Sequence, residues 1–297
     1  MSNKEVVREK MVGAAPTGTA PEGVSDDKKA PRRIITTLAE LGPQLPVGFN
    51  VGGVLVKDLR TRPWKTKDER ELSKLKKPKM SMATYIGIVL GQMCSKFGPH
   101  EWQPDTKMPE RQLGVAQAYM GDVFYAYMYL RTQVIGPELK MTITCPTDGC
   151  GNFTFKGDLG STEVSRIDSL DQLDWFHDLR DPVEIRKQTV TKFRLRAPRW
   201  TTLVTNSKED TMTMSMGKIM AVQGSVVGLN DDPAELALTD AEIDELSKYD
   251  LESIASRVND EFVGPKMVVE GECPKCERDF AAPIDWSYDR FFTTSSL

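Results

Sequence analysis

Histidine and long apolar runs are scarce in this chain, and each shortage excludes a class of protein. Only two histidines, His100 and His177, occur among 297 residues, so histidine-dependent catalysis is not expected. No stretch reaches the ~18–20 apolar residues that span a bilayer, because the longest candidate, residues 83–94, is too short. The first ten residues lack the apolar region of a secretion signal. We therefore expect a protein made in the cytoplasm, with no membrane among its partners.

Sequence motifs for catalysis are missing as well. The chain contains no phosphate-binding GxxxxGK[ST] or GxGxxG motif and no GxSxG motif of a nucleophilic serine. The acidic residues Asp168, Asp171 and Asp174 are interpreted as charges at the start of a helix rather than as paired catalytic carboxylates. The sequence therefore predicts a protein that is not an enzyme.

The charge balance gives no general attraction to nucleic acid. There are 39 Lys and Arg residues against 43 Asp and Glu, for a formal net charge of −4. Two basic clusters, over residues 57–79 and 186–199, can be read as a nucleic-acid footprint or as a solvated or partner-facing surface. The second interpretation is preferred, because the acidic segment 231–261 nearly cancels the basic charge. Nucleic acid is not expected as a partner.

The pattern of apolar, capping and turn residues predicts a mixed helix and strand order. We expect a helix over 66–76 with Thr66 as its N-cap, one over 80–97, and a helix between 109 and 135 whose aromatic residues belong to the core rather than to a base-stacking platform. The sequence next predicts a strand pair over 183–195, a helix over 199–216 and a strand over 218–222. Two helices are expected after the capping box at Thr239.

Four of the five cysteines form the one sharp chemical signal. Cys145 and Cys150 are spaced CxxxxC, and Cys273 and Cys276 are spaced CxxC. Alternating apolar residues flank each pair, which predicts a cysteine knuckle at the tip of each of two β-hairpins. Two such knuckles supply the four thiolates of a tetrahedral structural zinc site, which is the arrangement of a zinc ribbon. Zinc is therefore the expected cofactor, with these four residues as its ligands.

Three alternatives to zinc remain open at this stage. Disulfides between the pairs require an oxidising compartment, which the N-terminus argues against. A redox-active Cys273–Cys276 pair requires a strand–CxxC–helix context, whereas the flanks look like a hairpin. The four cysteines can also be unligated. Cys94 lies in an apolar stretch and is interpreted as a buried core thiol.

These features predict an α+β fold. A helical core carries a zinc ribbon of two cysteine-knuckle hairpins, a mixed α/β insertion lies between the knuckles, and an extended N-terminal arm precedes them. The arm, over residues 1–33, has too few large apolar residues to pack on its own domain and is either a flexible end or a segment that orders against a partner. The expected domain boundaries are 1–33 for the arm, 34–160 for the domain with the first knuckle, 161–265 for the insertion, and 266–297 for the second knuckle and tail.

The order of several short motifs resembles the tail baseplate (hub) protein family of T-even-like bacteriophages. The motifs are Leu45-Pro46-x-Gly48, Leu59-Arg60-x-Arg62 with Thr66–Glu69, Tyr129-Leu130-Arg131 leading through Gly136 to Cys145-Pro146, and Cys273–Cys276 followed by Phe291-Phe292. The resemblance covers about residues 40–297. It departs from the family at the first knuckle, which is CxxxxC where CxxC is commoner, and in the arm.

The resemblance implies a non-enzymatic structural component of a phage tail baseplate or hub. It would be made in the host cytoplasm, incorporated into the virion tail in several copies, and surrounded by other tail and baseplate proteins. Two alternatives are a tail-assembly chaperone that is absent from the mature virion, and a nucleic-acid-binding zinc-ribbon protein.

Overall fold

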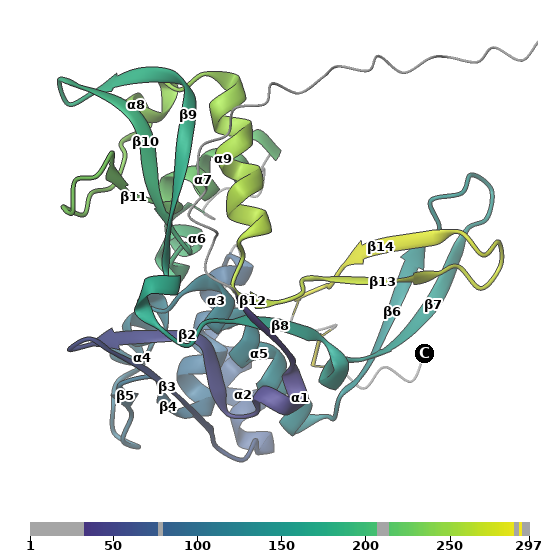
Figure 1. The fold of residues 1–297 in the computed structure, drawn as a ribbon. Helices are drawn as coiled ribbons and strands as arrows, with labels where there is room; N and C mark the ends of the chain where they lie inside the picture. Colours follow the sequence, from purple (N-terminus) through teal and green to yellow (C-terminus); the bar gives the residue numbers. More distant parts are fainter. Residues whose placement is uncertain (1–32, 77–79, 207–213, 288–290, 293–297) are drawn as a thin grey trace, which may run out of the picture. The chain divides into compact units, whose positions relative to one another are not determined.

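The computed structural model describes residues 33–76, 80–206, 214–287 and 291–292 (Figure 1). The predicted arm lies outside these residues except for Arg33, whose guanidinium forms a 2.6 Å ion pair with Glu261. The described chain is a mixed α+β fold, as the sequence predicts. The domain boundaries at residues 160 and 265 stay a prediction.

The first hydrophobic core surrounds a helix that is buried on nearly every side. This helix, α5, runs over Met120–Val134, and its side chains from Val123 to Met128 are all buried. Near the C-terminal end of the chain, Phe291 stacks on Tyr127 of α5 with ring centroids 5.2 Å apart. The other helices of this part of the chain are α1 (Leu38–Leu41), α2 (Thr66–Leu75), α3 (Met82–Met93) and α4 (Met108–Ala116). The aromatic residues of α5 are core residues, as predicted.

The single helix predicted between residues 109 and 135 is wrong, because α4 and α5 are separate helices. The chain between them forms backbone hydrogen bonds with a distant segment. Trp200 N–H donates to Ala118 O at 2.8 Å, Met120 N–H donates to Pro198 O at 2.9 Å, and Tyr119 forms a β-bridge with Arg199. The single N–H of Met120 is used by Pro198 and cannot also continue the helical ladder of α4.

The helix predicted over 80–97 also ends early, at Met93. Residues Cys94–Phe97 instead form β4, which pairs with β3 (Val54–Thr61) in a four-stranded antiparallel sheet. The other strands of this sheet are β2 (Gln44–Val51) and β5 (His100–Glu101), in the order β2-β3-β4-β5. The N-cap of α2 is Lys65 rather than Thr66, because the Asp68 carboxylate accepts the backbone N–H of Lys65 at 2.8 Å.

A three-stranded sheet joins segments from the start, middle and end of the chain. Its order is β1 (Ile34–Thr37), β8 (Glu163–Arg166) and β12 (Gly264–Pro265), all antiparallel. Gly121 in α5 allows β12 to lie directly against that helix, because a Cβ there would fall 1.7 Å from Val263 O. This sheet holds together the two ends of the segment between the knuckles.

A second hydrophobic core is built only from residues of the predicted insertion, between Trp175 and Val258. The predicted strand pair is present and longer than expected. It consists of β9 (Asp174–Ile185) and β10 (Gln188–Arg196), and β11 (Val226–Leu229) adds to β10. Helices of this part are α6 (Trp200–Asn206), α7 (Met214–Ser225), α8 (Asp240–Asp244) and α9 (Lys248–Asp260).

Two further predictions for this part are wrong. Residues 218–222 belong to helix α7, not to a strand, and the strand follows at Val226. Asp168 and Asp171 lie before and within a short 3-10 turn, η2 (Leu170–Gln172), and Asp174 begins β9, so none of them starts an α-helix. The capping box at Thr239 is confirmed, because its hydroxyl accepts Glu242 N–H at 3.3 Å at the start of α8.

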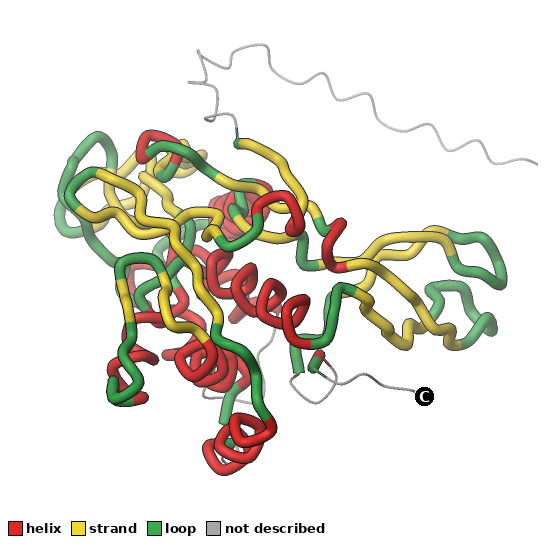
Figure 2. Tube along the Cα trace, turned by 90° about the horizontal axis from the view of Figure 1, so that it is seen from below, coloured by secondary structure: helices red, strands yellow, loops and turns green. Residues whose placement is uncertain are grey.

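Two separate hairpins carry the four paired cysteines. The first consists of β6 (Glu138–Thr144) and β7 (Asn152–Asp158), and a 3-10 turn, η1 (Leu159–Ser161), follows it. The second consists of β13 (Val268–Glu272) and β14 (Asp279–Pro283). The hairpins lie side by side in Figure 1, and Figure 2 shows the loops at their tips at the same end of the pair.

Candidate metal centre

The first knuckle is a tight loop that closes on itself through backbone hydrogen bonds. Cys145 N–H donates to Gly151 O at 3.1 Å, and Cys150 N–H donates to Thr147 O, also at 3.1 Å. Gly149 and Gly151 have φ values of +76° and +79°, a left-handed conformation that favours glycine. These glycines let the loop fold back so that both sulfur atoms face the second hairpin.

The second knuckle is also closed by two backbone hydrogen bonds, and it contains no glycine. Cys273 N–H donates to Arg278 O at 2.9 Å, and Glu277 N–H donates to Cys273 O at 2.9 Å. Glu277 directly follows the second cysteine of its pair, as Gly151 does, and it has a φ of +57°. This left-handed conformation is sterically unfavourable for a residue with a Cβ, so the backbone at Glu277 is strained where the first knuckle has a glycine.

The two knuckles bring the four predicted ligand atoms together. All four sulfur atoms lie within 4.8 Å of one another, with 3.5 Å between Cys145 Sγ and Cys276 Sγ and 3.7 Å between Cys150 Sγ and Cys273 Sγ. A tetrahedral zinc site with Zn–S bonds of about 2.3 Å places its sulfurs about 3.8 Å apart. The arrangement therefore fits a metal ion of this kind, and these cysteines could hold one.

Aromatic side chains beneath the sulfurs hold the hairpins together. Phe280 of β14 packs edge-on against Phe153 and Phe155 of β7, with centroid distances of 5.1 and 5.7 Å. Cys145 and Cys273 belong to the same small apolar cluster and are 6% and 1% exposed. One wall of the site is therefore dry, and the other side, at Cys276, is open to solvent.

Two polar residues that the sequence interpretation did not single out also join the knuckles. The ammonium group of Lys275 donates to Asn152 O at 2.9 Å and to Cys150 O at 3.3 Å, so the second knuckle is bonded to the first by its own central residue. The Thr147 hydroxyl lies 3.5 Å from Cys276 Sγ. A lysine inside a CxxC pair gives no local signal of this role, because its partners are more than 120 residues away in the sequence.

The thiols influence one another's ionisation. The Thr147 hydroxyl and the backbone N–H of Arg278 lower the pKa of Cys276 to about 6. Burial and the neighbouring sulfur atoms raise the pKa of Cys150 to about 12. Four thiolates this close repel one another, and a bound cation removes that repulsion. The site is therefore suited to a divalent metal ion more than to four free thiols.

All five cysteines are unbridged, and strands rather than a strand and a helix flank Cys273 and Cys276. Cys94 is 1% exposed at the start of β4, and burial raises the pKa of its thiol to about 12. It is the buried core thiol that the sequence predicts, although it lies in a strand and not in a helix.

The two histidines lie apart from the cysteines. His100 packs between aromatic rings of the first core, with its centroid 5.3 Å from Phe49 and 6.3 Å from Trp102. His177 lies in β9 and pairs with Phe193 of β10. Burial lowers the pKa of both imidazoles, which favours their neutral forms.

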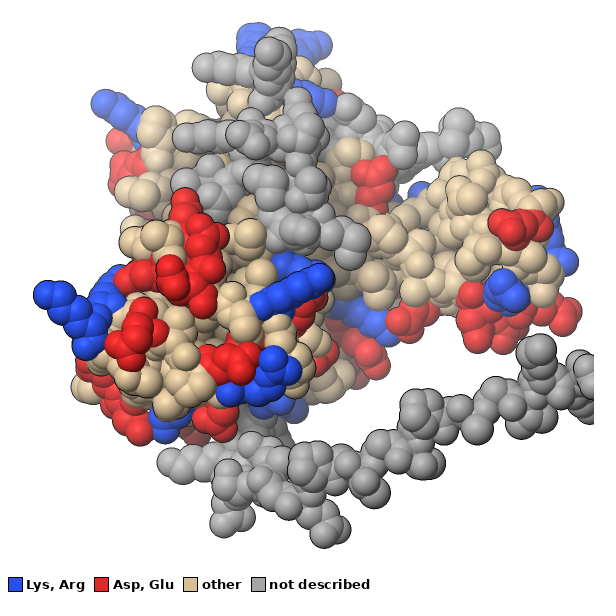
Figure 3. All heavy atoms as spheres, turned by 90° about the horizontal axis from the view of Figure 1, so that it is seen from above, with Lys and Arg blue, Asp and Glu red and all other residues tan. Residues whose placement is uncertain are grey.

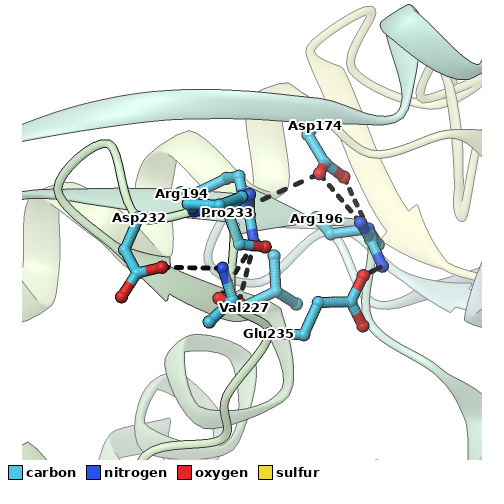
Figure 4. Close-up of polar contacts among 8 residues, drawn as sticks. Asp174, Arg194, Arg196, Val227, Asp232, Pro233 and Glu235 are labelled. Atoms are coloured by element: carbon cyan, nitrogen blue, oxygen red, sulfur yellow. Dashed lines mark hydrogen bonds and ion pairs between the residues drawn. The ribbon is translucent and has the colours of Figure 1, made fainter.

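The arginines of the basic cluster 186–199 are largely engaged within the protein. Figure 4 shows Arg196 between two carboxylates, with Nη2 2.8 Å from Asp174 and Nη1 2.7 Å from Glu235. Arg194 donates to Pro233 O at 3.0 Å, and Arg186 forms a 2.8 Å ion pair with Glu242. On the face drawn in Figure 3, basic and acidic residues are intermixed and do not form a band of one sign. This pattern favours a solvated or partner-facing surface.

Comparisons with protein-family models, with curated proteins and with solved structures give no match for this chain. Among the described residues, no helix has the length and apolar character needed to cross a membrane.

Proposed function

We propose that this chain is a non-enzymatic structural protein in which one Zn²⁺ ion joins two hairpins into a zinc ribbon. The convergence of the Cys145, Cys150, Cys273 and Cys276 sulfurs within 4.8 Å carries the proposal. Four thiolates favour zinc over harder cations such as magnesium or calcium. With all four positions filled by sulfur there is no open position for substrate, so the ion is structural.

The zinc stabilises the connection between two distant parts of the chain. The cysteine pairs are separated by more than 120 residues, and the second core lies in the segment between them. Metal binding and docking of the two hairpins are therefore coupled, so that each one favours the other. In this protein the ion fixes the pair of hairpins as one rigid element for contact with other proteins.

The assembly that we propose is the tail baseplate or hub of a bacteriophage. This proposal is supported by the resemblance in the order of the motifs. A metal site that joins two hairpins, and arginines that form internal ion pairs, are consistent with a structural component. A tail-assembly chaperone and a nucleic-acid-binding zinc-ribbon protein remain the alternatives.

The metal is tested on the purified full chain by elemental analysis and thiol titration. We expect about one zinc per chain and four thiols that react only after a chelator is added. The variant Cys273→Ser should lose the zinc, and Cys94→Ala should keep it, because Cys94 lies outside the cluster. Less than half an equivalent of zinc with four immediately reactive thiols would contradict the zinc site.

The assembly is tested by mass spectrometry of purified phage particles from cells that express this protein. Detection in the mature particle supports a tail component, and detection only in assembly intermediates supports the chaperone. Steeply salt-dependent binding to DNA by the isolated chain supports the nucleic-acid alternative instead.

The predicted arm has its own test, which concerns residues 1–30. A chain that lacks them should keep its zinc and its fold, because the described core and the cysteine cluster lie beyond this segment. We expect it to lose incorporation into particles. Incorporation at the normal level would show that the arm makes no necessary contact.

A further inference from the structure

A cavity of about 580 Å³ lies at the C-terminal end of helix α3, away from the cysteine cluster. Its walls come from α2, α3, β4, α4 and the segment before α4. Three cationic side chains line it, those of Arg62, Lys67 and Arg111, and Trp102 forms part of the wall. Sites for small organic molecules commonly have volumes of about 300–1,000 Å³.

Two of the cations lie next to each other because both bind the end of the same helix. Arg111 Nη1 donates to Gly91 O at 3.2 Å, and Arg62 Nε donates to Gln92 O at 2.7 Å. These carbonyls belong to consecutive residues of the last turn of α3. Gly91 leaves room for the close packing of α4 on α3, because a Cβ there would lie 3.2 Å from Arg111 Cβ.

Arg111 is a buried cation that forms no ion pair with a described residue, although Asp105 and Glu110 lie near enough to stabilise its charge in part. It is 8% exposed, and its bonds go only to carbonyls, which include Thr106 O at 3.0 Å and Gln103 O at 2.7 Å. Burial, and then repulsion from Arg62, lower the pKa of its guanidinium. A buried charge of this kind is stabilised when an anion approaches it.

The two carboxylates of the cavity are already engaged. Asp68 accepts from Arg62 Nη2 at 2.9 Å and from Lys65 N–H at 2.8 Å, and Glu71 accepts from Gln92 Nε2 at 2.8 Å. Lys67 is exposed and forms no ion pair with a described residue. Among the residues that line the cavity, three are therefore cationic and two are acidic, and both acidic side chains already have hydrogen-bond partners.

Unused donors remain on both guanidinium groups. A guanidinium has five N–H donors, and the bonds described above use only Nε and one Nη2 donor of Arg62. Arg111 uses Nε, one donor on Nη1 and both donors on Nη2. The second Nη2 donor bonds to Pro104 O at 3.4 Å. Arg62 thus offers up to three N–H groups and Arg111 one, which suits the planar pairing of guanidinium with phosphate or carboxylate oxygens.

We propose that this cavity binds a small organic oxyanion, a molecule with phosphate or carboxylate groups that Arg62, Arg111 and Lys67 hold against Trp102. The cavity volume favours a molecule larger than a single phosphate ion. The site is separate from the zinc site, so this inference does not depend on the proposed structural role.

The test is isothermal titration calorimetry of the full chain at low salt with two probes, pyrophosphate and citrate. We expect at least one of them to bind at submillimolar concentration, with an affinity that falls as salt is added. The probe that binds distinguishes the phosphate from the carboxylate source. If neither probe binds at a concentration of about 10 mM, the proposal is overturned, because a specific site would have a lower Kd than that.

Matched variants assign the binding to this cavity. Arg62→Gln should weaken the bound probe about tenfold or more, since it removes a charge-assisted pair of hydrogen bonds. Lys67→Gln should weaken it about threefold and keep the fold, because Lys67 is exposed. Arg60→Gln is the control, since Arg60 is an exposed neighbour that does not line the cavity, and its affinity should equal that of the unchanged chain. If Lys67→Gln and Arg62→Gln both bind the probe with the affinity of the unchanged chain, the site is refuted even though a probe binds.

Discussion

The buried carboxylate of Asp122 connects helix α5 to strand β2, and its replacement gives a sharp test of the fold. Asp122 is fully buried in the first turn of α5, and its two oxygens accept Val47 N–H at 2.7 Å and Gly48 N–H at 3.0 Å. Two effects oppose each other there. Burial raises the pKa of Asp122, to about 7, and the two N–H donors and the ammonium group of Lys57 oppose that rise.

The raised pKa makes the stability contribution of Asp122 depend on pH. An unfolded aspartate has a pKa of about 3.9, so between pH 4 and 7 the unfolded chain loses a proton that the folded chain keeps. The free energy of unfolding therefore falls as pH rises, by about 1.4 kcal/mol per pH unit and about 4 kcal/mol in all. Above pH 7 both states are ionised, and this dependence ends.

The variant Asp122→Asn separates the hydrogen bonds from the titration. Asparagine offers one acceptor oxygen, so one of the two buried N–H groups faces an amide donor, and at pH 5 we expect a loss of about 1–3 kcal/mol. Asparagine does not titrate, so the difference between the two proteins should shrink by about 1.4 kcal/mol per unit from pH 5 to pH 7.

The assay is urea unfolding of the zinc-loaded protein at pH 5, 6, 7 and 8. Asp58→Asn, which changes an exposed carboxylate of β3, is the control and should alter stability by less than about 0.5 kcal/mol at each pH. A difference between the unchanged protein and Asp122→Asn that stays constant, or grows, from pH 5 to pH 8 would refute the reasoning. It would mean that the N–H donors and Lys57 outweigh burial.

Three further substitutions should give measurable changes in urea unfolding. Glu277→Gly should stabilise the zinc-loaded protein by about 1 kcal/mol, because it relieves the left-handed backbone at φ +57°, and Glu277→Ala should not. Lys187→Gly should have a similar effect at φ +65° in the two-residue turn between β9 and β10, and no gain there would contradict the strain argument. Phe280→Ala should cost about 3–5 kcal/mol, because it empties the space between the hairpins, and the loss should appear as weaker zinc binding as well. An unchanged zinc affinity in Phe280→Ala would show that the knuckles dock without the aromatic cluster.

Local patterns in the sequence determined the features that depend on neighbouring residues. The alternation on both sides of each cysteine pair predicted the two hairpins, and the pairs themselves predicted which four sulfurs meet. The capping residue Thr239 and the apolar run through Tyr125 predicted a helix start and a buried helix. Each signal lies within about ten residues of the structure that it specifies.

Only the tertiary structure decided features whose partners are distant in the chain. The segment 117–119 leaves the helix because its backbone bonds to residues 198–200, and no local residue indicates this. Residues 218–222 form part of a helix, whereas the sequence predicted a strand. The prediction failed because the periodicity of a run of five residues does not distinguish a helix from a strand. The roles of Asp122 and Lys275 and the cavity beside Arg111 likewise depend on groups brought close by folding. Hydrogen bonds and charges act through space, so their partners become visible only once the chain is folded.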